Sequence, residues 1–146
     1  MQTVKIKKLN DNAIIPKKAH DDDAGFDLYA CIPDPIVIHP HKTVLIGTGI
    51  SVELPKETFG AIFARSGLAF KSGLAPANKV GVVDCNYRGE VCVALHNHSE
   101  MPKEVVSGER IAQMVVMPYV NVSLELSEEL SDTDRGSGGF GSTGKN

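Results

Sequence analysis

The chain has 146 residues, of which 42% are hydrophobic, and a formal net charge of −3 at pH 7. This length predicts one domain with a hydrophobic core, and the composition excludes a chain that is disordered throughout. The charged residues form no basic stripe, so we expect no nucleic-acid partner.

The sequence also lacks the features of a membrane or secreted protein. No apolar run approaches the ~18 residues of a membrane span, so we expect no membrane partner. Residues 1–8 lack the apolar segment of a signal peptide. The cysteines show no C-x-x-C spacing, which predicts free thiols and a cytoplasmic location. They are Cys31, Cys85 and Cys92.

Short segments with strand patterns follow one another along the chain, separated by proline and glycine. We expect strands at residues 4–6, 36–38, 43–46, 50–54, 58–64, 80–83, 90–95 and 111–117, and residues 122, 124 and 126 continue the alternation. The segments 80–83 and 90–95 flank a turn-like stretch, which predicts a β-hairpin. At most a turn or two of helix is expected, after residues 65–67. Many short strands predict an all-β sandwich or barrel.

Residues 135–144 are rich in glycine and serine and cannot join a core. Glycine lets the backbone approach a ligand closely, and successive N–H groups cradle anions. Arg135 can bind phosphate oxygens, and Phe140 can stack on a base. The segment therefore fits a flexible lid over a nucleotide, while a disordered tail without a function fits the same composition. Residues 139–145 have the spacing of a phosphate-binding loop, but no strand precedes them and Asn146 follows, which rejects that class of NTPase.

Four further segments combine glycine with polar and charged side chains. They are AGFDLYA (24–30), ARSGLA (64–69), GVVDCNYRG (81–89) and GERIAQM (108–114). Together with the C-terminal segment, and in this order, they resemble the five motifs of the trimeric, all-β dUTP pyrophosphatases (dUTPases). The resemblance extends from about residue 24 to residue 144.

The resemblance implies an all-β subunit, a jelly-roll-like distorted β-barrel (the dUTPase β-clip), that assembles as a homotrimer. Residues 1–126 would form the β-barrel catalytic domain, and residues 127–146 a flexible, Gly-rich arm that closes a neighbouring active site. The implied reaction is dUTP + water → dUMP + pyrophosphate, which limits uracil incorporation into DNA and supplies dUMP for dTMP synthesis. Mg²⁺ is the implied cofactor, held mainly by the triphosphate.

The resemblance also implies residue roles. Asp84 would be the general base that activates water, and Ser66 and Gln113 would be the other catalytic residues. Asp27 would act on the metal indirectly, through water. The implied substrate-binding residues are Arg65, Ser66, Gly67, Asn78, Val80, Asp84, Tyr87, Cys92, Gln113, Arg135, Phe140, Gly141, Ser142 and Thr143.

Several of these roles have a simpler alternative: Asn78 fits a loop residue before a strand, and Asp27 fits a turn residue. Asp84 also fits a turn aspartate that binds its own backbone, and Tyr87 fits packing on a hairpin face. Arg65 fits an ion pair with Asp27, which is compatible with phosphate binding. The run of residues 20–23, one histidine and three aspartates, fits a solvated loop better than a metal site.

Two other functions stay open. A dCTP deaminase of the same fold resembles this chain in the barrel but uses a glutamate in the third motif, where this chain has Asp84. A catalytically idle nucleotide-binding regulatory protein is the other, and the intact set of Asp84, Tyr87, Gln113 and Phe140 argues against it. The pair Cys85–Asn86 departs from the acidic or small residues frequent in the family, but it removes no residue with an implied role.

Overall fold

The computed structural model describes residues 2–139, and nearly all of its regular elements are strands. The strands are β1 (Lys5–Lys8), β2 (Phe26–Tyr29), β3 (Ile36–Ile38), β4 (Thr43–Gly47), β5 (Ile50–Glu53), β6 (Thr58–Phe63), β7 (Leu74–Pro76), β8 (Gly81–Asp84), β9 (Cys92–Asn97), β10 (Lys103–Val105) and β11 (Arg110–Pro118). The single helix of the described residues is α1 (Ser66–Ser72). The predicted all-β class is confirmed, and the short helix predicted after residues 65–67 begins slightly earlier, at Ser66.

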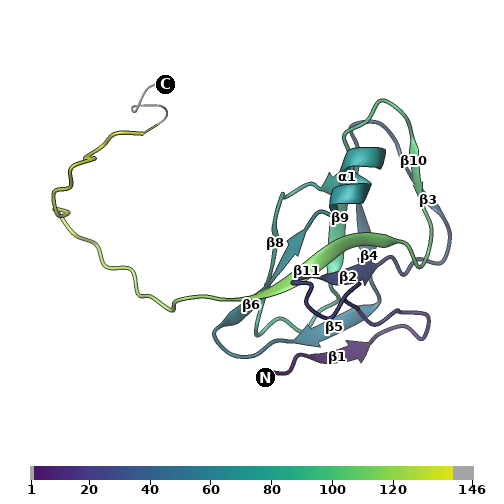
Figure 1. The fold of residues 1–146 in the computed structure, drawn as a ribbon, viewed down its shortest axis with the longest axis horizontal. Coiled ribbons are helices and arrows are strands. Elements are labelled where there is room, and N and C mark those ends of the chain that lie inside the picture. The colour runs from purple at the N-terminus through teal and green to yellow at the C-terminus, as the bar shows by residue number, and fades with distance from the viewer. Residues whose placement is uncertain (1, 140–146) are drawn as a thin grey trace.

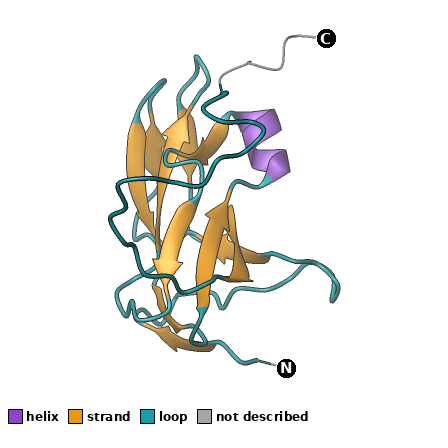
Figure 2. Cartoon of the chain, turned by 90° about the vertical axis from the view of Figure 1, so that its left-hand side faces the viewer, coloured by secondary structure: helices purple, strands orange, loops and turns teal. Residues whose placement is uncertain are grey.

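The strands form several small sheets around one core (Figure 1). The four-stranded sheet has the order β2-β11-β6-β8, and the three-stranded sheet has the order β4-β9-β7. Two antiparallel pairs, β1-β5 and β10-β3, complete the body. The largest side chains without solvent exposure come from several of these sheets, and they include Leu28, Ile38, Ile46, Leu95 and Met114. Figure 2 shows α1 at one end of the strands and the N-terminus near the other.

The four-stranded sheet has one core face and one outer face. Because side chains alternate along a strand, cross-strand partners share a face. Met114 pairs with Ile62 on the core face, and both are buried. On the outer face, Gln113 pairs with Asp27 on one side and with Phe63 on the other. This face therefore carries the polar side chains of Asp27 and Gln113 on the neighbouring strands β2 and β11.

The predicted β-hairpin of residues 80–83 and 90–95 is wrong, because these two strands do not pair with each other. β8 pairs with β6, whereas β9 pairs with β4 and β7, so the two strands belong to different sheets. The hydrophobic patterns locate both strands correctly, but residues 85–91 span a gap between two sheets instead of closing a ladder. That separation leaves room for a pocket between β8 and β9.

Helix α1 begins directly after β6 and ends at Gly73, which has φ 69°. A left-handed residue of this kind is the usual helix stop, and glycine adopts it without strain. The short helix fixes Arg65 and Ser66 at the end of β6, beside the outer face of the four-stranded sheet.

Beyond β11 the chain leaves the body, so the continued alternation at residues 122–126 forms no strand (Figure 1). Leu124 and Leu126 are 97% and 100% exposed, since no element of the described chain covers them. No helix among residues 2–139 is both long and apolar enough to cross a membrane.

Asn97 is the buried polar centre that joins β9 to two neighbouring segments. Its side chain is fully buried, and Nδ2 donates hydrogen bonds to the carbonyl oxygens of Ile38 at 2.9 Å and Met101 at 2.8 Å. Oδ1 accepts bonds from the N–H of Ser99 at 2.9 Å and from its hydroxyl at 2.8 Å. All the hydrogen-bonding capacity of this amide is used within the protein.

We expect Asn97→Ala to lower the free energy of unfolding by about 3 kcal/mol or more, because it leaves several buried groups without partners. Urea unfolding at fixed protein concentration measures the change, and Asn121→Ala, at an exposed asparagine, is the matched control. A loss at Asn97 no larger than that of the control would contradict the role assigned to this amide.

Candidate functional site

A polar pocket of about 360 Å³ lies on the outer face of the four-stranded sheet. It brings together four residues predicted to act on phosphates or metal: Asp27, Arg65, Ser66 and Gln113. They come from β2, the end of β6, the start of α1 and β11. Gly67, the next residue of α1, has open space where a side chain would stand. We call this pocket the phosphate pocket.

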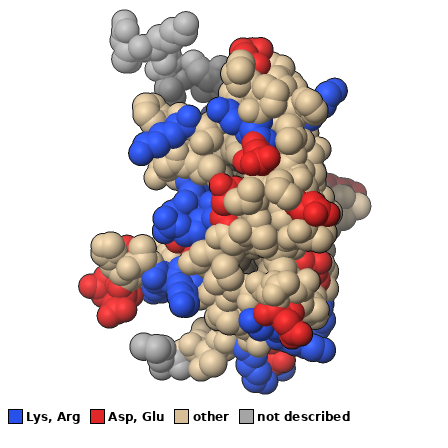
Figure 3. All heavy atoms as spheres, turned by 90° about the vertical axis from the view of Figure 1, so that its right-hand side faces the viewer, with Lys and Arg blue, Asp and Glu red and all other residues tan. Residues whose placement is uncertain are grey.

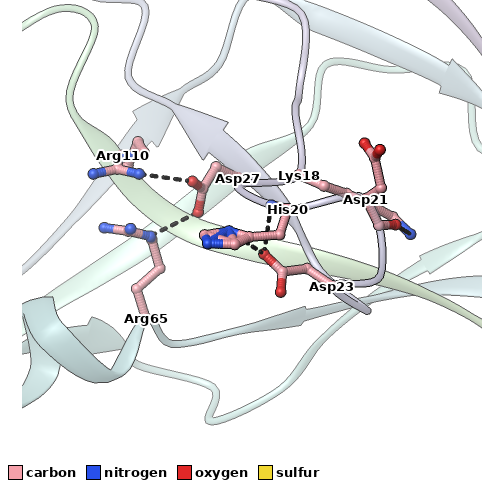
Figure 4. A network of polar contacts seen from close by, with 7 residues as sticks. All are labelled: Lys18, His20, Asp21, Asp23, Asp27, Arg65 and Arg110. Carbon is pink, nitrogen blue, oxygen red and sulfur yellow. Dashed lines mark hydrogen bonds and ion pairs between the residues drawn. The ribbon is translucent and has the colours of Figure 1, made fainter.

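Two arginines bind the carboxylate of Asp27 (Figure 4). Arg65 Nε lies 2.7 Å from Oδ1, and Arg110 Nη1 lies 3.2 Å from Oδ2. The Asp27 side chain is only 12% exposed, and the two arginines compensate a charge that would otherwise be costly to bury. The predicted Arg65–Asp27 ion pair is confirmed, whereas Arg110 was not predicted to join it. Because Arg65 binds through Nε, its two Nη groups have no acceptor among residues 2–139.

Gln113 is held over Gly25. Its Nε2 donates to the carbonyl oxygen of Ala64 at 2.9 Å, which leaves one amide N–H for a ligand. A Cβ atom at Gly25 would collide with Oε1 of Gln113. Glycine is therefore required at position 25 for the glutamine amide to lie where it does.

A second pocket, of about 380 Å³, opens between β8 and β9. It contains four of the predicted residues, namely Asn78, Asp84, Tyr87 and Cys92. Ile62 and Val91 contribute apolar wall, and Glu90 adds a carboxylate that sequence reasoning had not singled out. We call it the base pocket, for its implied ligand.

Tyr87 and Cys92 are set differently in this pocket. The Tyr87 ring contacts Gly89, and its hydroxyl donates to the carbonyl oxygen of Glu90 at 3.0 Å. Burial raises the pKa of the Cys92 thiol, and the negative charge of Glu90 raises it further. Cys92 is therefore a neutral, unreactive wall residue at pH 7.

Other predicted residues lie outside both pockets. Val80 is 40% exposed and stands beside Asn78, whose carbonyl oxygen accepts its N–H at 2.7 Å. Arg135 lies in the extended segment, where Nε binds the carbonyl oxygen of Gly138 at 2.8 Å. Phe140, Gly141, Ser142 and Thr143 lie outside the described residues.

The acidic loop at residues 20–23 borders the phosphate pocket through Asp23. Asp23 accepts a hydrogen bond from the His20 N–H at 2.9 Å (Figure 4), which is an ordinary turn contact. Within residues 2–139, no group of three or more His, Cys, Asp or Glu side chains is arranged to hold a metal. On the face seen in Figure 3, basic and acidic side chains lie next to one another.

The two pockets are far apart within one chain. Asp84 pairs with Phe59 and Gln113 pairs with Phe63, on opposite sides of β6. At strand rise and spacing, this register separates the two residues by about 13 Å along the sheet and about 10 Å across it, or about 16 Å in total. No residue lines both pockets.

Comparisons with known proteins agree over nearly the whole chain. The family model of the dUTPases matches residues 11–144. The chain is 49% identical over 141 residues to the deoxyuridine 5′-triphosphate nucleotidohydrolase of Picosynechococcus sp., covering 97% of this chain and 98% of that protein. It is also 49% identical over 143 residues to that of Clostridium tetani, covering 98% and 97%. Among solved structures, a mutant dUTPase of Staphylococcus bacteriophage 80alpha with dUpNHpp is similar, with a TM-score of 0.90 at 27% identity over 99% of each chain.

Proposed function

The chain belongs to the dUTPase family, and we propose that it hydrolyses dUTP to dUMP and pyrophosphate through the residues of the two pockets. The observation that carries the assignment of roles is the different chemistry of the residues that line the two pockets. The phosphate pocket offers the donors of Arg65, Ser66 and Gln113 beside two aspartates. Among the described residues, the base pocket offers no cation but two carboxylates, a tyrosine and an apolar wall. In the cell, this reaction limits uracil incorporation into DNA and supplies dUMP, and we place it in the cytoplasm.

Asp84 is the proposed general base. It ends β8, is exposed, and lies in the same pocket as Tyr87, so its carboxylate can reach a water next to a nucleotide seated there. The carboxylate takes a proton from this water as the oxygen attacks the α-phosphorus, and pyrophosphate leaves. Tyr87 packs under the deoxyribose, where its ring leaves no space for a 2′-hydroxyl.

The proposed specificity for uracil comes from the two strand arms that flank the base pocket. Residues 78–80 precede β8 and Cys92 begins β9, and backbone groups in these segments cannot rotate to suit a different base. A wrong base would leave buried donors or acceptors without partners. Asn78 is the proposed side-chain contact.

Arg65, Ser66, Gly67 and Gln113 are the proposed phosphate ligands. Asp27 binds only the Nε of Arg65, and within residues 2–139 both Nη groups have no acceptor, so the guanidinium is oriented and still able to donate. The Ser66 hydroxyl and the remaining Gln113 N–H add neutral donors where negative charge develops on the leaving group.

The donor set fits a Mg²⁺ ion that is held mainly by the triphosphate. Each oxygen of Asp27 already accepts a bond from an arginine, which suits a contact through water better than direct coordination. Mg²⁺ readily keeps its waters and binds substrate phosphates. When bound, the ion would neutralise phosphate charge.

We further propose a homotrimer whose active sites lie between subunits. A separation of about 16 Å is too long for one bound dUTP to place its α-phosphate at both Asp84 and Gln113 of the same chain. The outer sheet face between the two pockets is apolar and partly open, with Val82 63% exposed and Met117 38% exposed. A second subunit that covers this face would place one of its own pockets next to the complementary pocket of the first subunit.

The arm is the third proposed component. Residues 127–146 would close a neighbouring site, with Arg135, Ser142 and Thr143 on the phosphates, Gly141 allowing close approach, and Phe140 on uracil. The described part of the arm makes no contact with the two pockets of its own chain, which supports closure of another subunit's site.

The reaction is tested by pyrophosphate release from dUTP, dCTP, dTTP and UTP. We expect kcat/KM for dUTP to exceed each of the others by at least about 10²-fold, because the base pocket rejects substituents on the ring and on the sugar. Ammonia release from dCTP would identify a deaminase. Tight dUTP binding without turnover would identify an idle regulatory protein.

A further inference from the structure

Glu90 lies in the base pocket next to the third motif, and nothing in the family resemblance gives its side chain a role. Its Oε1 accepts the backbone N–H of Gly49 at 2.7 Å. The carboxylate packs on Gly47, where an added Cβ atom would lie only 2.5 Å from Oε1. The side chain thus ties the loop before β9 to the turn between β4 and β5.

The backbone of Glu90 in turn holds Tyr87. The carbonyl oxygen of Glu90 accepts the Tyr87 hydroxyl at 3.0 Å, and the ring lies against Gly89, where any side chain would collide with it. The next residue is fixed independently, since Val91 N–H donates to the Ile50 carbonyl oxygen at 2.8 Å. Glu90 therefore has one anchored end at Val91 and a second anchor through its own side chain.

We propose that Glu90 is a positioning residue that sets the discrimination between deoxyribose and ribose by fixing Tyr87 through this carbonyl; the proposal rests on the proposed dUTP hydrolysis. Without the Glu90 side-chain bond, this loop is held at Val91 and at the Tyr87 N–H, which donates to the Asp84 carbonyl oxygen at 3.1 Å. Between these two points the Glu90 carbonyl can turn, and the Tyr87 ring moves by enough to admit a 2′-hydroxyl. A small displacement suffices, because a steric wall against one hydroxyl acts only at van der Waals contact.

The experiment compares kcat/KM for dUTP and UTP in Glu90→Ala, Glu90→Gln and Glu53→Ala. We expect Glu90→Ala to lower the dUTP-to-UTP ratio by about tenfold or more, mainly through a gain in UTP turnover. Glu90→Gln keeps an oxygen that accepts the Gly49 N–H, so its ratio should stay within about threefold of the parent. Glu53 is an exposed carboxylate paired with Lys5 at 2.8 Å and with Arg88 at 4.0 Å, and Glu53→Ala controls for loss of a negative charge near this loop.

A double-mutant cycle with Tyr87→Phe tests the route of the effect. Tyr87→Phe keeps the ring but removes the hydroxyl bond to Glu90. If Glu90 acts through that bond, the double variant should discriminate no worse than Tyr87→Phe alone, so the two effects are not additive. Additive losses would overturn the proposal.

A purely structural role would lower the unfolding midpoint of Glu90→Ala and leave its ratio of kcat/KM for dUTP and UTP unchanged. That result would also overturn the proposal.

If Glu90→Ala proves too unstable to assay, Gly47→Ala displaces the carboxylate without removing it, and we expect the same loss of discrimination. A parent protein that does not hydrolyse dUTP would instead refute the proposed function, so the two failures are distinguishable.

Discussion

Replacing Asp84 by Asn is expected to abolish most turnover of dUTP and to leave the fold and nucleotide binding intact. An amide of the same shape still binds water but cannot take its proton, and loss of a general base lowers the rate by about 10²–10⁴-fold. Because Asp84 is exposed and forms no side-chain ion pair among residues 2–139, no buried interaction is lost. Pyrophosphate release under saturating dUTP measures the change.

Asp34→Asn is the matched control, since Asp34 is also an exposed aspartate but lies in a loop away from both pockets. Its turnover should equal that of the parent. Turnover of Asp84→Asn within about tenfold of the parent would reject Asp84 as the base. A change confined to KM would instead assign it to binding.

Removal of the residues after Asp134 is expected to leave a folded assembly and to suppress turnover of dUTP as strongly as Asp84→Asn does. The described residues of this segment contribute nothing to the core, so stability should not change. Catalysis needs closure that excludes water and completes the phosphate shell. Phe140→Ala should have a smaller effect, a loss of about 1–3 kcal/mol of base stacking. Unfolding of the truncated chain, or normal turnover, would contradict the proposed arm.

Refolding the two inactive proteins together locates the arm. When Asp84→Asn chains and truncated chains are unfolded, mixed equally and refolded, neither supplies a complete set of parts. If base and arm come from different subunits, about a quarter of the sites in a randomly mixed cyclic oligomer receive both. We expect that recovery, with each variant refolded alone as control. No recovery in oligomers shown by mass spectrometry to be mixed would place the arm over its own subunit's site.

The local patterns of the sequence predict most strands, because alternation reports which side of a strand is buried. β11 and β6 lie close to their predicted ranges, at Arg110–Pro118 and Thr58–Phe63. The short strands β2, β7 and β10 were missed. Segments of three or four residues show little periodicity, and these three lack the run of β-branched residues that marks β3. Residues 122–126 alternate like a strand, but within one chain they have no sheet to join.

Long-range pairing is what the sequence could not predict. Nothing in their spacing indicates that Arg110 reaches Asp27, 83 residues away, or that Glu90 reaches the backbone 41 residues away. The separation of β8 and β9 into two sheets has the same cause, since each hydrophobic segment is compatible with several partners. The motif resemblance named most of the polar residues of each pocket but not Glu90, and the distance between the pockets is visible only in the fold.

The buried amide of Asn97 also restricts how this protein can be produced. Residues 97–99 read Asn-His-Ser, which is an acceptor triplet for N-linked glycans. A glycan on Nδ2 would replace a hydrogen that bonds to the Ile38 or Met101 carbonyl and would have to fit into a side chain's space with no solvent exposure. Attachment during translation, before β9 is folded, would therefore prevent the chain from reaching its native state, and expression in a secretory host calls for an inhibitor of glycosylation.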